Sequence, residues 1–146
     1  MYVNSSLAKV EAMRAGYDEA LMCTTSGLIS EGTGENVFVV RDGRLFTPPP
    51  SAAGALEGIT ADSVATMAHD LGYSVTEREM RRTDLYMADE AFLTGTAAEV
   101  VPIGSVDDRP LGTGKPGPIT REIQETYFAT VRGKVDRYKD WLEYVE

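Results

Sequence analysis

The amino-acid sequence predicts an α/β (α+β) domain, in which short strands and helices alternate and a sheet provides the core. Two apolar runs at 37–40 and 44–47 flank Asp42-Gly43, a pair typical of a tight β-hairpin turn. Residues 60–71 then carry apolar side chains at helical spacing, namely Val64, Met67, Ala68 and Leu71. The alternation of strands and helices continues beyond this helix.

Length, composition and charge limit the class of protein. The chain has 146 residues, 42% of them hydrophobic, which suits one domain with a core and is too apolar for a disordered segment. Its 23 acidic and 14 basic residues give a net charge of −9, which disfavours nucleic acids and anionic membrane surfaces as partners. No apolar run approaches the ~20 residues of a membrane helix, and no signal-peptide pattern opens the chain. Cys23 is the single cysteine, so we expect a reducing, cytoplasmic setting and a small buried side chain there.

The first third of the chain predicts one helix followed by two short strands. Residues 3–15 form the helix, with Asn4 or Ser5 as N-cap and Gly16 as its end. Its expected apolar face consists of Leu7, Val10, Ala12 and Met13. Residues 18–24 and 28–29 are the expected strands, joined by a Ser-Gly turn.

The middle of the chain predicts a loop, an edge strand and a central strand. The run 48–50 is Pro-Pro-Pro and, with the small residues that follow to 55, predicts a crossing loop. Residues 73–80 are expected to form an edge strand and 83–86 a helical turn. Strands at 90–94 and 100–103 follow. The only histidine, His69, is expected on the solvent side of its helix and not as a metal ligand.

The last third predicts a second long helix. Residues 107–112 form a turn into a short strand, and 113–117 a glycine-rich loop. The helix begins at Pro118 and ends at Gly133, with one apolar face made of Ile119, Ile123, Tyr127 and Val131. The tail 137–145 carries the large side chains expected to pack it, Trp141, Leu142 and Tyr144. No metal-ligand spacing occurs.

Residues 30–38, Ser-Glu-Gly-Thr-Gly-Glu-Asn-Val-Phe, have the pattern of a binding loop. Glu31 and Glu35 flank a Gly-Thr-Gly kink that permits close backbone approach, and Asn36 can fix the turn. A tight turn whose glutamates face water is the alternative that these residues leave open. A second element, Gly95-Thr96, lies between two strands and suits either an anion site or a β-bulge.

In their order, these segments resemble the signature of the fold-type IV pyridoxal-phosphate enzymes, and specifically of the branched-chain amino-acid aminotransferases. The matching positions are Glu31, Thr33, Asn36, Val37, Phe38, Leu45, Thr47, Leu56, Gly58, Ile59 and Thr60. The likeness continues through 95–99 and 114–118 to the tail, and so covers essentially the whole chain. Ala61 departs from it, because the family usually has a basic residue there.

The resemblance implies the large domain of a fold-type IV enzyme, with mixed β-sheets or a pseudo-barrel and flanking helices, that binds pyridoxal 5′-phosphate. Glu31 would face the pyridine nitrogen and keep it protonated, which makes the ring an electron acceptor. Tyr2 would donate a hydrogen bond to the phenolic oxygen, and Leu56 would pack against the ring. Glu35 and Asn36 would shape the cofactor site.

The resemblance also implies where the phosphate and the substrate bind. The phosphate would be held at a helix start and at a strand end, by Gly58, Ile59, Thr60, Gly95 and Thr96. Backbone amides near Thr96 and Ala97 would meet the substrate carboxylate. The implied substrates are amino acids and 2-oxo acids.

The family's lysine that forms the Schiff base lies just before the tyrosine matching Tyr2, and no lysine of this chain matches it. The family's smaller N-terminal domain is missing as well. Residues 1–146 therefore resemble the C-terminal large domain alone, without a catalytic residue. We expect a truncated, inactive form of an enzyme that transaminates leucine, isoleucine and valine with 2-oxoglutarate. We also expect homo-oligomers, because removal of a domain exposes apolar surface.

Two other functions remain open at this point. A D-amino-acid aminotransferase and an aminodeoxychorismate lyase share the fold, although the Gly-Lys-Pro-Gly-Pro stretch at 114–118 favours the branched-chain type. The chain could instead be a non-catalytic binding or assembly module.

Overall fold

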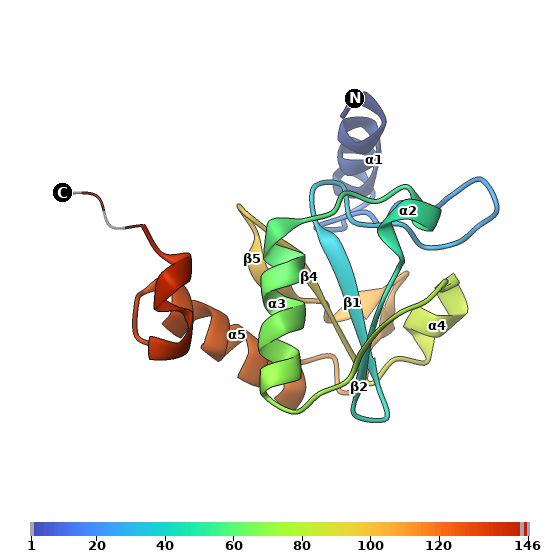
Figure 1. Cartoon of the computed structure of the whole chain (residues 1–146). Coiled ribbons are helices and arrows are strands. Elements are labelled where there is room, and N and C mark those ends of the chain that lie inside the picture. Colours follow the sequence, from blue (N-terminus) through green and yellow to red (C-terminus); the bar gives the residue numbers. More distant parts are fainter. Residues whose placement is uncertain (1, 144, 146) are drawn as a thin grey trace.

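The computed structural model describes residues 2–143 and 145, and its centre is a five-stranded sheet in the order β3–β2–β1–β4–β5 (Figure 1). The strands are β1 (Asn36–Arg41), β2 (Arg44–Thr47), β3 (Val75–Glu77), β4 (Glu90–Gly95) and β5 (Glu99–Pro102). β2 and β3 run parallel, whereas all other neighbours run antiparallel. The mixed sheet with flanking helices predicted from the sequence is confirmed.

Two tight turns form where the sequence predicts them. Asp42 and Gly43 join β1 to β2 with φ of 50° and 72°, a left-handed pair that matches the twist of a hairpin. Asp107 and Asp108 join β6 (Ser105–Val106) to β7 (Arg109–Pro110), also with positive φ. Short polar side chains tolerate this conformation better than others.

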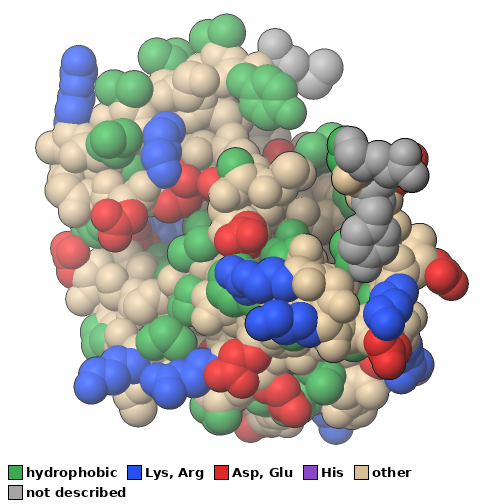
Figure 2. Space-filling view, turned by 90° about the vertical axis from the view of Figure 1, so that its left-hand side faces the viewer, with side chains coloured by type: hydrophobic (Ala, Val, Ile, Leu, Met, Phe, Trp, Pro, Cys, Tyr) green, Lys and Arg blue, Asp and Glu red, His purple; other side chains and the backbone are tan. Residues whose placement is uncertain are grey.

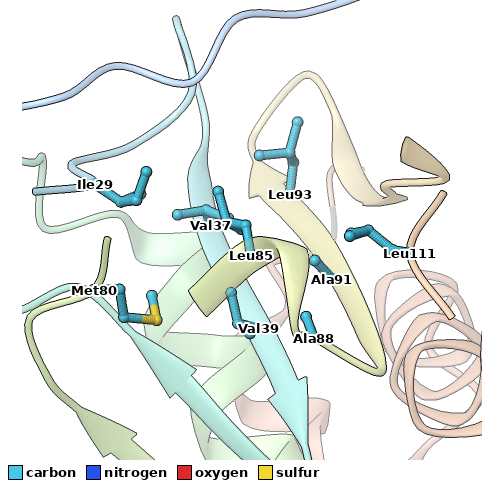
Figure 3. Close-up of a cluster of buried hydrophobic side chains, with 9 residues drawn as sticks. All are labelled: Ile29, Val37, Val39, Met80, Leu85, Ala88, Ala91, Leu93 and Leu111. Carbon is cyan, nitrogen blue, oxygen red and sulfur yellow. The ribbon is translucent and has the colours of Figure 1, made fainter. Parts of the chain in front are cut away.

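Both faces of the sheet are buried. Successive side chains of β1 point to opposite faces, and each face contributes to its own apolar cluster. One face packs under α4 (Arg82–Tyr86), and Figure 3 shows its cluster of Ile29, Val37, Val39, Met80, Leu85, Ala88, Ala91, Leu93 and Leu111. The other face packs under α3 (Ile59–Asp70) and α5 (Pro118–Val131). There Phe38 stacks on Phe92 of the neighbouring strand, with ring centroids 5.2 Å apart.

The helices α3 and α5 confirm the predicted periodicity. Val64, Met67 and Ala68 of α3 are buried, and His69 is exposed as expected. Ile123 is the buried centre of the predicted face of α5, while Val131 is exposed, contrary to expectation, because the end of α5 lies away from the sheet (Figure 1).

A buried carboxylate holds the start of α5 on the sheet. Glu90 of β4 accepts the N–H of Ile119 (3.2 Å) and of Thr120 (2.7 Å). A Cβ on Gly117 would overlap the Glu90 side chain, so only glycine fits before this helix. The Glu90 carboxylate therefore caps the N-terminus of α5, although it belongs to a strand and not to the residue before the helix.

The helix α1 (Val3–Arg14) forms as predicted but stands away from the rest of the molecule (Figure 1). It buries no residue, and Leu7 is 64% exposed, so the expected apolar face does not pack on this chain. Apolar side chains lie along the top of Figure 2, at the level of this helix. Tyr2 is its N-cap, without a side-chain cap bond, so Asn4 and Ser5 do not cap it.

Several expectations for irregular segments need correction. The two strands expected at 18–24 and 28–29 reduce to isolated bridges, one of them between Cys23 and Ile29. Cys23 is exposed and not buried. The crossing loop contains a short helix, α2 (Pro50–Ala53), and the edge strand expected at 73–80 is only β3.

The tail is only partly packed. The 3-10 helix η1 (Asp136–Trp141) buries Tyr138, whose hydroxyl donates to Asp70 of α3 (2.7 Å). Trp141, expected to pack, is 47% exposed, and Tyr144 lies outside the described residues. None of the helices in the described part of the chain is long and apolar enough to cross a membrane.

Candidate active site

The loop between Ser30 and β1 folds back on itself. The N–H of Gly32 donates to the carbonyl of Glu35 (2.6 Å), and a Cβ on Gly32 would lie 2.8 Å from Glu35 Oε2. Glycine is therefore required for the close approach at this point. The result is a compact turn that presents Glu31 at one end and Asn36 at the other.

The two ends of this loop hold one residue, Leu56, between them. Glu31 Oε2 accepts the N–H of Leu56 (2.9 Å), and Asn36 Nδ2 donates to the carbonyl of Leu56 (2.8 Å). Both bonds fix the backbone that leads into α3, while the Leu56 side chain remains 62% exposed. Glu31 Oε1 makes no hydrogen bond within the described residues, so one carboxylate oxygen is anchored and the other is free.

The start of α3 lies directly against this loop. A Cβ on Gly58 would overlap Asn36 Oδ1, so the glycine lets helix and loop touch. Gly58 is also the N-cap and provides no side-chain cap, which leaves the first N–H groups of α3 open to an anion. Thr60 is buried in the first turn, whereas Ile59 is 84% exposed.

The turn between β4 and β5 completes the group. A Cβ on Gly95 would lie 3.2 Å from the carbonyl of Gly34 and 3.3 Å from Glu35 Cγ. Thr96 and Ala97 follow in an exposed turn that Glu99, with φ of 60°, closes. The segment is thus a hairpin turn and not a β-bulge, and it brings a hydroxyl and free amides beside the Glu31 loop.

The structure therefore brings together most of the site residues that the sequence predicts. Asn36, Leu56, Gly58 and Ile59 also line a pocket of about 690 Å³ that reaches under the loop before α3. Tyr2 stands apart from this group, because it is 67% exposed and its side chain makes no hydrogen bond within the described residues. The described residues contain no group of side chains that could hold a metal ion.

Sequence reasoning missed one set of polar residues beside the loop. Lys9 of α1 forms an ion pair with Glu19 (2.6 Å), and Thr33 of the loop donates to the same carboxylate (2.6 Å). Glu35, predicted as a cofactor ligand, accepts the Gly34 amide (3.1 Å), and its carboxyl lies near that of Glu19. These residues are far apart in sequence, and no spacing rule links them.

Two shifted pKa values mark this set. Burial raises the pKa of Glu35, and the nearby Glu19 carboxylate raises it further against the lowering effects of the Gly34 amide and Lys9. Burial alone would raise the pKa of Glu19, but hydrogen bonds from Lys9, Thr33 and Ala20 outweigh it and lower the pKa. Of the two carboxyls, Glu35 is therefore the one that holds a proton more readily.

A glycine-bounded acidic loop, an open helix N-terminus and a Gly-Thr turn at the end of a strand therefore lie beside one another in this fold. The sequence profile of the family described as Amino-transferase class IV matches residues 1–106, and the chain belongs to this family. Within it, the chain is similar to branched-chain-amino-acid aminotransferases. The probable enzyme of Aquifex aeolicus is 51% identical over 97% of this chain and 45% of that protein. The enzyme of Pseudomonas aeruginosa is 44% identical over 99% of this chain and 47% of that protein.

Solved structures show the same similarity. The branched-chain amino acid aminotransferase of T.th., complexed with N-(5′-phosphopyridoxyl)-L-glutamate, superposes with a TM-score of 0.96 at 50% identity, covering 99% of this chain and 49% of that one. The branched-chain aminotransferase of Thermoproteus uzoniensis, solved with norvaline, superposes with a TM-score of 0.92 at 50% identity. This match covers 97% of this chain and 46% of that one. The fold is therefore that of the fold-type IV aminotransferases. The chain spans about half the length of the relatives that it matches.

Proposed function

We propose that this chain is the pyridoxal-phosphate-binding part of a branched-chain amino-acid aminotransferase. The observation that carries the proposal is the Leu56 backbone, held by Glu31 on one side and Asn36 on the other. This arrangement leaves the second oxygen of Glu31 free, beside an uncapped helix N-terminus and the Gly95-Thr96 turn. Relatives at 44–51% identity that are named branched-chain aminotransferases support it.

The residues present fit pyridoxal 5′-phosphate by their chemistry. A dianionic phosphate suits the open amides of Ile59 and Thr60 and the hydroxyl of Thr96. A flat heteroaromatic ring suits the exposed Leu56 side chain. A protonated ring nitrogen suits the free oxygen of Glu31, which is the acceptor that a buried cation needs.

When bound, the cofactor supplies a ring that accepts the electrons released as the Cα proton of an amino acid leaves. The contribution of this chain is to hold that ring. Glu31 keeps a proton at the pyridine nitrogen, and the Leu56 amide fixes the direction of its carboxylate. The open amides of Thr96 and Ala97 bind the substrate carboxylate in this proposal, because exposed turn amides are free donors.

The substrate class is part of the same proposal. The T.th. enzyme has been solved complexed with 4-methylvaleric acid, a branched aliphatic acid, at 50% identity to this chain. This favours branched-chain substrates over the D-amino-acid aminotransferase and lyase alternatives. A purely non-catalytic module does not account for the free Glu31 oxygen.

We further propose that residues 1–146 are the large, C-terminal domain, and that the Schiff-base lysine and the small domain belong to the other half of the length seen in the relatives. Lys9 does not take the place of that lysine, because its ammonium is engaged by Glu19 and by the Asp18 carbonyl. Homo-oligomers in a reducing, cytoplasmic setting complete the proposal. Its support is the exposed apolar surface of α1 and the single cysteine.

Isothermal titration of the chain with pyridoxal 5′-phosphate tests the proposal. Weak, non-covalent binding is expected, and Thr96→Ala should weaken it by about tenfold or more, since a hydrogen bond to a charged group contributes ~1.5–3 kcal/mol. Thr113→Ala, in the exposed glycine-rich loop, is the control and should bind like the parent. Absence of binding to the parent, or equal binding by the Thr96 variant, would remove the phosphate assignment.

A further inference from the structure

Three separate segments meet at one carboxylate, that of Glu19. Lys9 of α1 donates from Nζ to Glu19 Oε2 (2.6 Å) and to the carbonyl of Asp18 (2.7 Å). The N–H of Ala20 (2.8 Å) and the hydroxyl of Thr33 (2.6 Å) both donate to Glu19 Oε1. The Glu19 side chain is only 17% exposed, so these bonds are shielded from water.

Thr33 is the residue of the loop that most needs a fixed partner. It lies between Gly32 and Gly34, and glycine has the largest backbone freedom to lose. Without a bond at Thr33, this Gly-Thr-Gly stretch has only its turn bond and the flanking contacts to hold it. The bond to Glu19 ties the middle of the stretch to the segment that follows α1.

The same segment also holds the backbone of the loop. The N–H of Met22 donates to the carbonyl of Glu31 (2.7 Å), and the N–H of Ser30 donates to the carbonyl of Met22 (2.9 Å). Glu31 is therefore held on one side by this pairing and, two residues later, by the Thr33–Glu19 bond. Lys9 extends the connection into α1, which begins directly after Tyr2.

Glu35 closes the network from the far end of the loop. Its side chain packs against Gly32 and Gly95, and its carboxyl lies near that of Glu19. The Lys9 ammonium, paired with Glu19, offsets the repulsion between the two carboxyls. The loop is thus bonded to Glu19 at Thr33, and Glu35 lies beside the same charged group.

We propose that Glu19 is a positioning residue that fixes the Glu31 loop to α1, through its bonds to Thr33 and Lys9, and so holds in place the loop that carries the Glu31 carboxylate. Its importance for pyridoxal phosphate rests on the proposed function, whereas its effect on the loop does not. Glu19 touches neither ring nor substrate in this proposal. It acts on the loop through its bond to Thr33.

Amide hydrogen exchange and binding of pyridoxal phosphate, both measured on the whole chain, test this role of Glu19. Thr33→Val removes the hydroxyl at nearly constant size, and Thr33→Ser restores it. Exchange at the Gly32 and Gly34 amides should quicken by about tenfold or more in the valine variant, as expected on losing a bond to a charged group. It should return to within about twofold of the parent in the serine variant.

Glu19→Gln and a matched control complete the design. The glutamine keeps an acceptor for Thr33 but loses the charge that pairs with Lys9, so exchange should quicken and the absorbance band of bound pyridoxal 5′-phosphate should shift. Glu11→Gln, at an exposed site on α1, is the control and should change neither the exchange rates nor the absorbance band. Melting curves followed by circular dichroism identify any variant that fails to fold. If Glu19→Gln fails to fold, the comparison of Thr33→Val with Thr33→Ser decides whether Glu19 fixes the loop.

The outcomes separate the two proposals. Unchanged exchange in the Thr33→Val variant overturns the role of Glu19, whatever the cofactor does. Faster exchange with unchanged affinity and absorbance also overturns it, because the loop would then move without affecting the site. If the parent does not bind pyridoxal phosphate, the proposed function fails, and the exchange rates still decide whether Glu19 fixes the loop.

Discussion

Gly58 is the residue at which the loop and the helix approach most closely. Its backbone, with φ of −78° and ψ of 130°, is one that alanine adopts without strain. An added Cβ would nevertheless overlap Asn36 Oδ1 and displace the side chain that holds the Leu56 carbonyl. We expect Gly58→Ala to lower the free energy of unfolding by about 1–3 kcal/mol, the usual cost of overpacking.

Urea unfolding measures this change, and the chain offers a matched control. A Cβ on Gly34 meets nothing within 4 Å, so Gly34→Ala should be neutral or slightly stabilising. The double variant Gly58→Ala, Asn36→Ala should recover part of the loss, because the overlapping atom is gone. A Gly58 variant as stable as the parent would mean that loop and helix do not touch as described.

The pKa of Glu35 predicts a pH dependence at the residue scale. Burial and Glu19 raise the pKa of the folded carboxyl above its value in the unfolded chain, and Lys9 only partly offsets them. The stabilisation from this group is therefore complete below about pH 4.3 and is lost as the pH rises through the folded pKa. Glu35→Gln resembles the protonated form and should flatten the stability–pH curve in that window. An unchanged slope in the variant would contradict the assignment.

Among the elements, α5 depends on a cap that comes from another strand. Glu90→Ala removes both acceptors of the Ile119 and Thr120 amides, and we expect the free energy of unfolding to fall by about 0.5–2 kcal/mol, as for a lost N-cap. Glu125→Ala on the exposed side of the same helix is the control. Equal stability of the two variants in urea would show that Glu90 does not cap this helix.

Elements with periodic or turn-specific patterns could be predicted from the sequence, and those with neither could not. Asp42-Gly43 and the apolar spacing of α3 correspond to local rules, and both were correct. The caps by Glu90 and the bonds of Glu19 join segments far apart in the chain, and no local rule signals them. The residues around Leu56 were predicted as one group only because a family signature orders them; their contacts to the Leu56 backbone are visible only in the fold.

The helix α1 shows a different limit of sequence reasoning. Its spacing gives the correct helix, yet no residue on it is buried, and its large apolar side chains stay exposed. Periodicity identifies an apolar face but does not say which chain covers it. Cys23 illustrates a related limit. Its apolar neighbours in the sequence predict a buried side chain, but the structure places this side chain at the surface.

At the scale of the whole molecule, the exposed apolar side chains of α1 predict self-association of this chain. Leu7, Val10 and Met13 are 64%, 45% and 61% exposed on one helix, and such surface is rarely left open in water. Leu7→Glu combined with Met13→Glu should shift sedimentation at micromolar concentration towards the monomer. Val131→Glu, at an exposed apolar site on α5, should not. A parent that is monomeric and binds no hydrophobic dye would contradict this.

The central claim is that Glu31 meets the ring nitrogen of pyridoxal phosphate. The most direct measurement is the 15N resonance of cofactor labelled at that nitrogen, bound to the chain. The parent should show a protonated nitrogen, as should Glu57→Gln, an exposed neighbour of Leu56. Glu31→Gln should shift the resonance towards the unprotonated position, because the amide cannot balance the positive charge. A protonated nitrogen in the Glu31→Gln variant would contradict the claim.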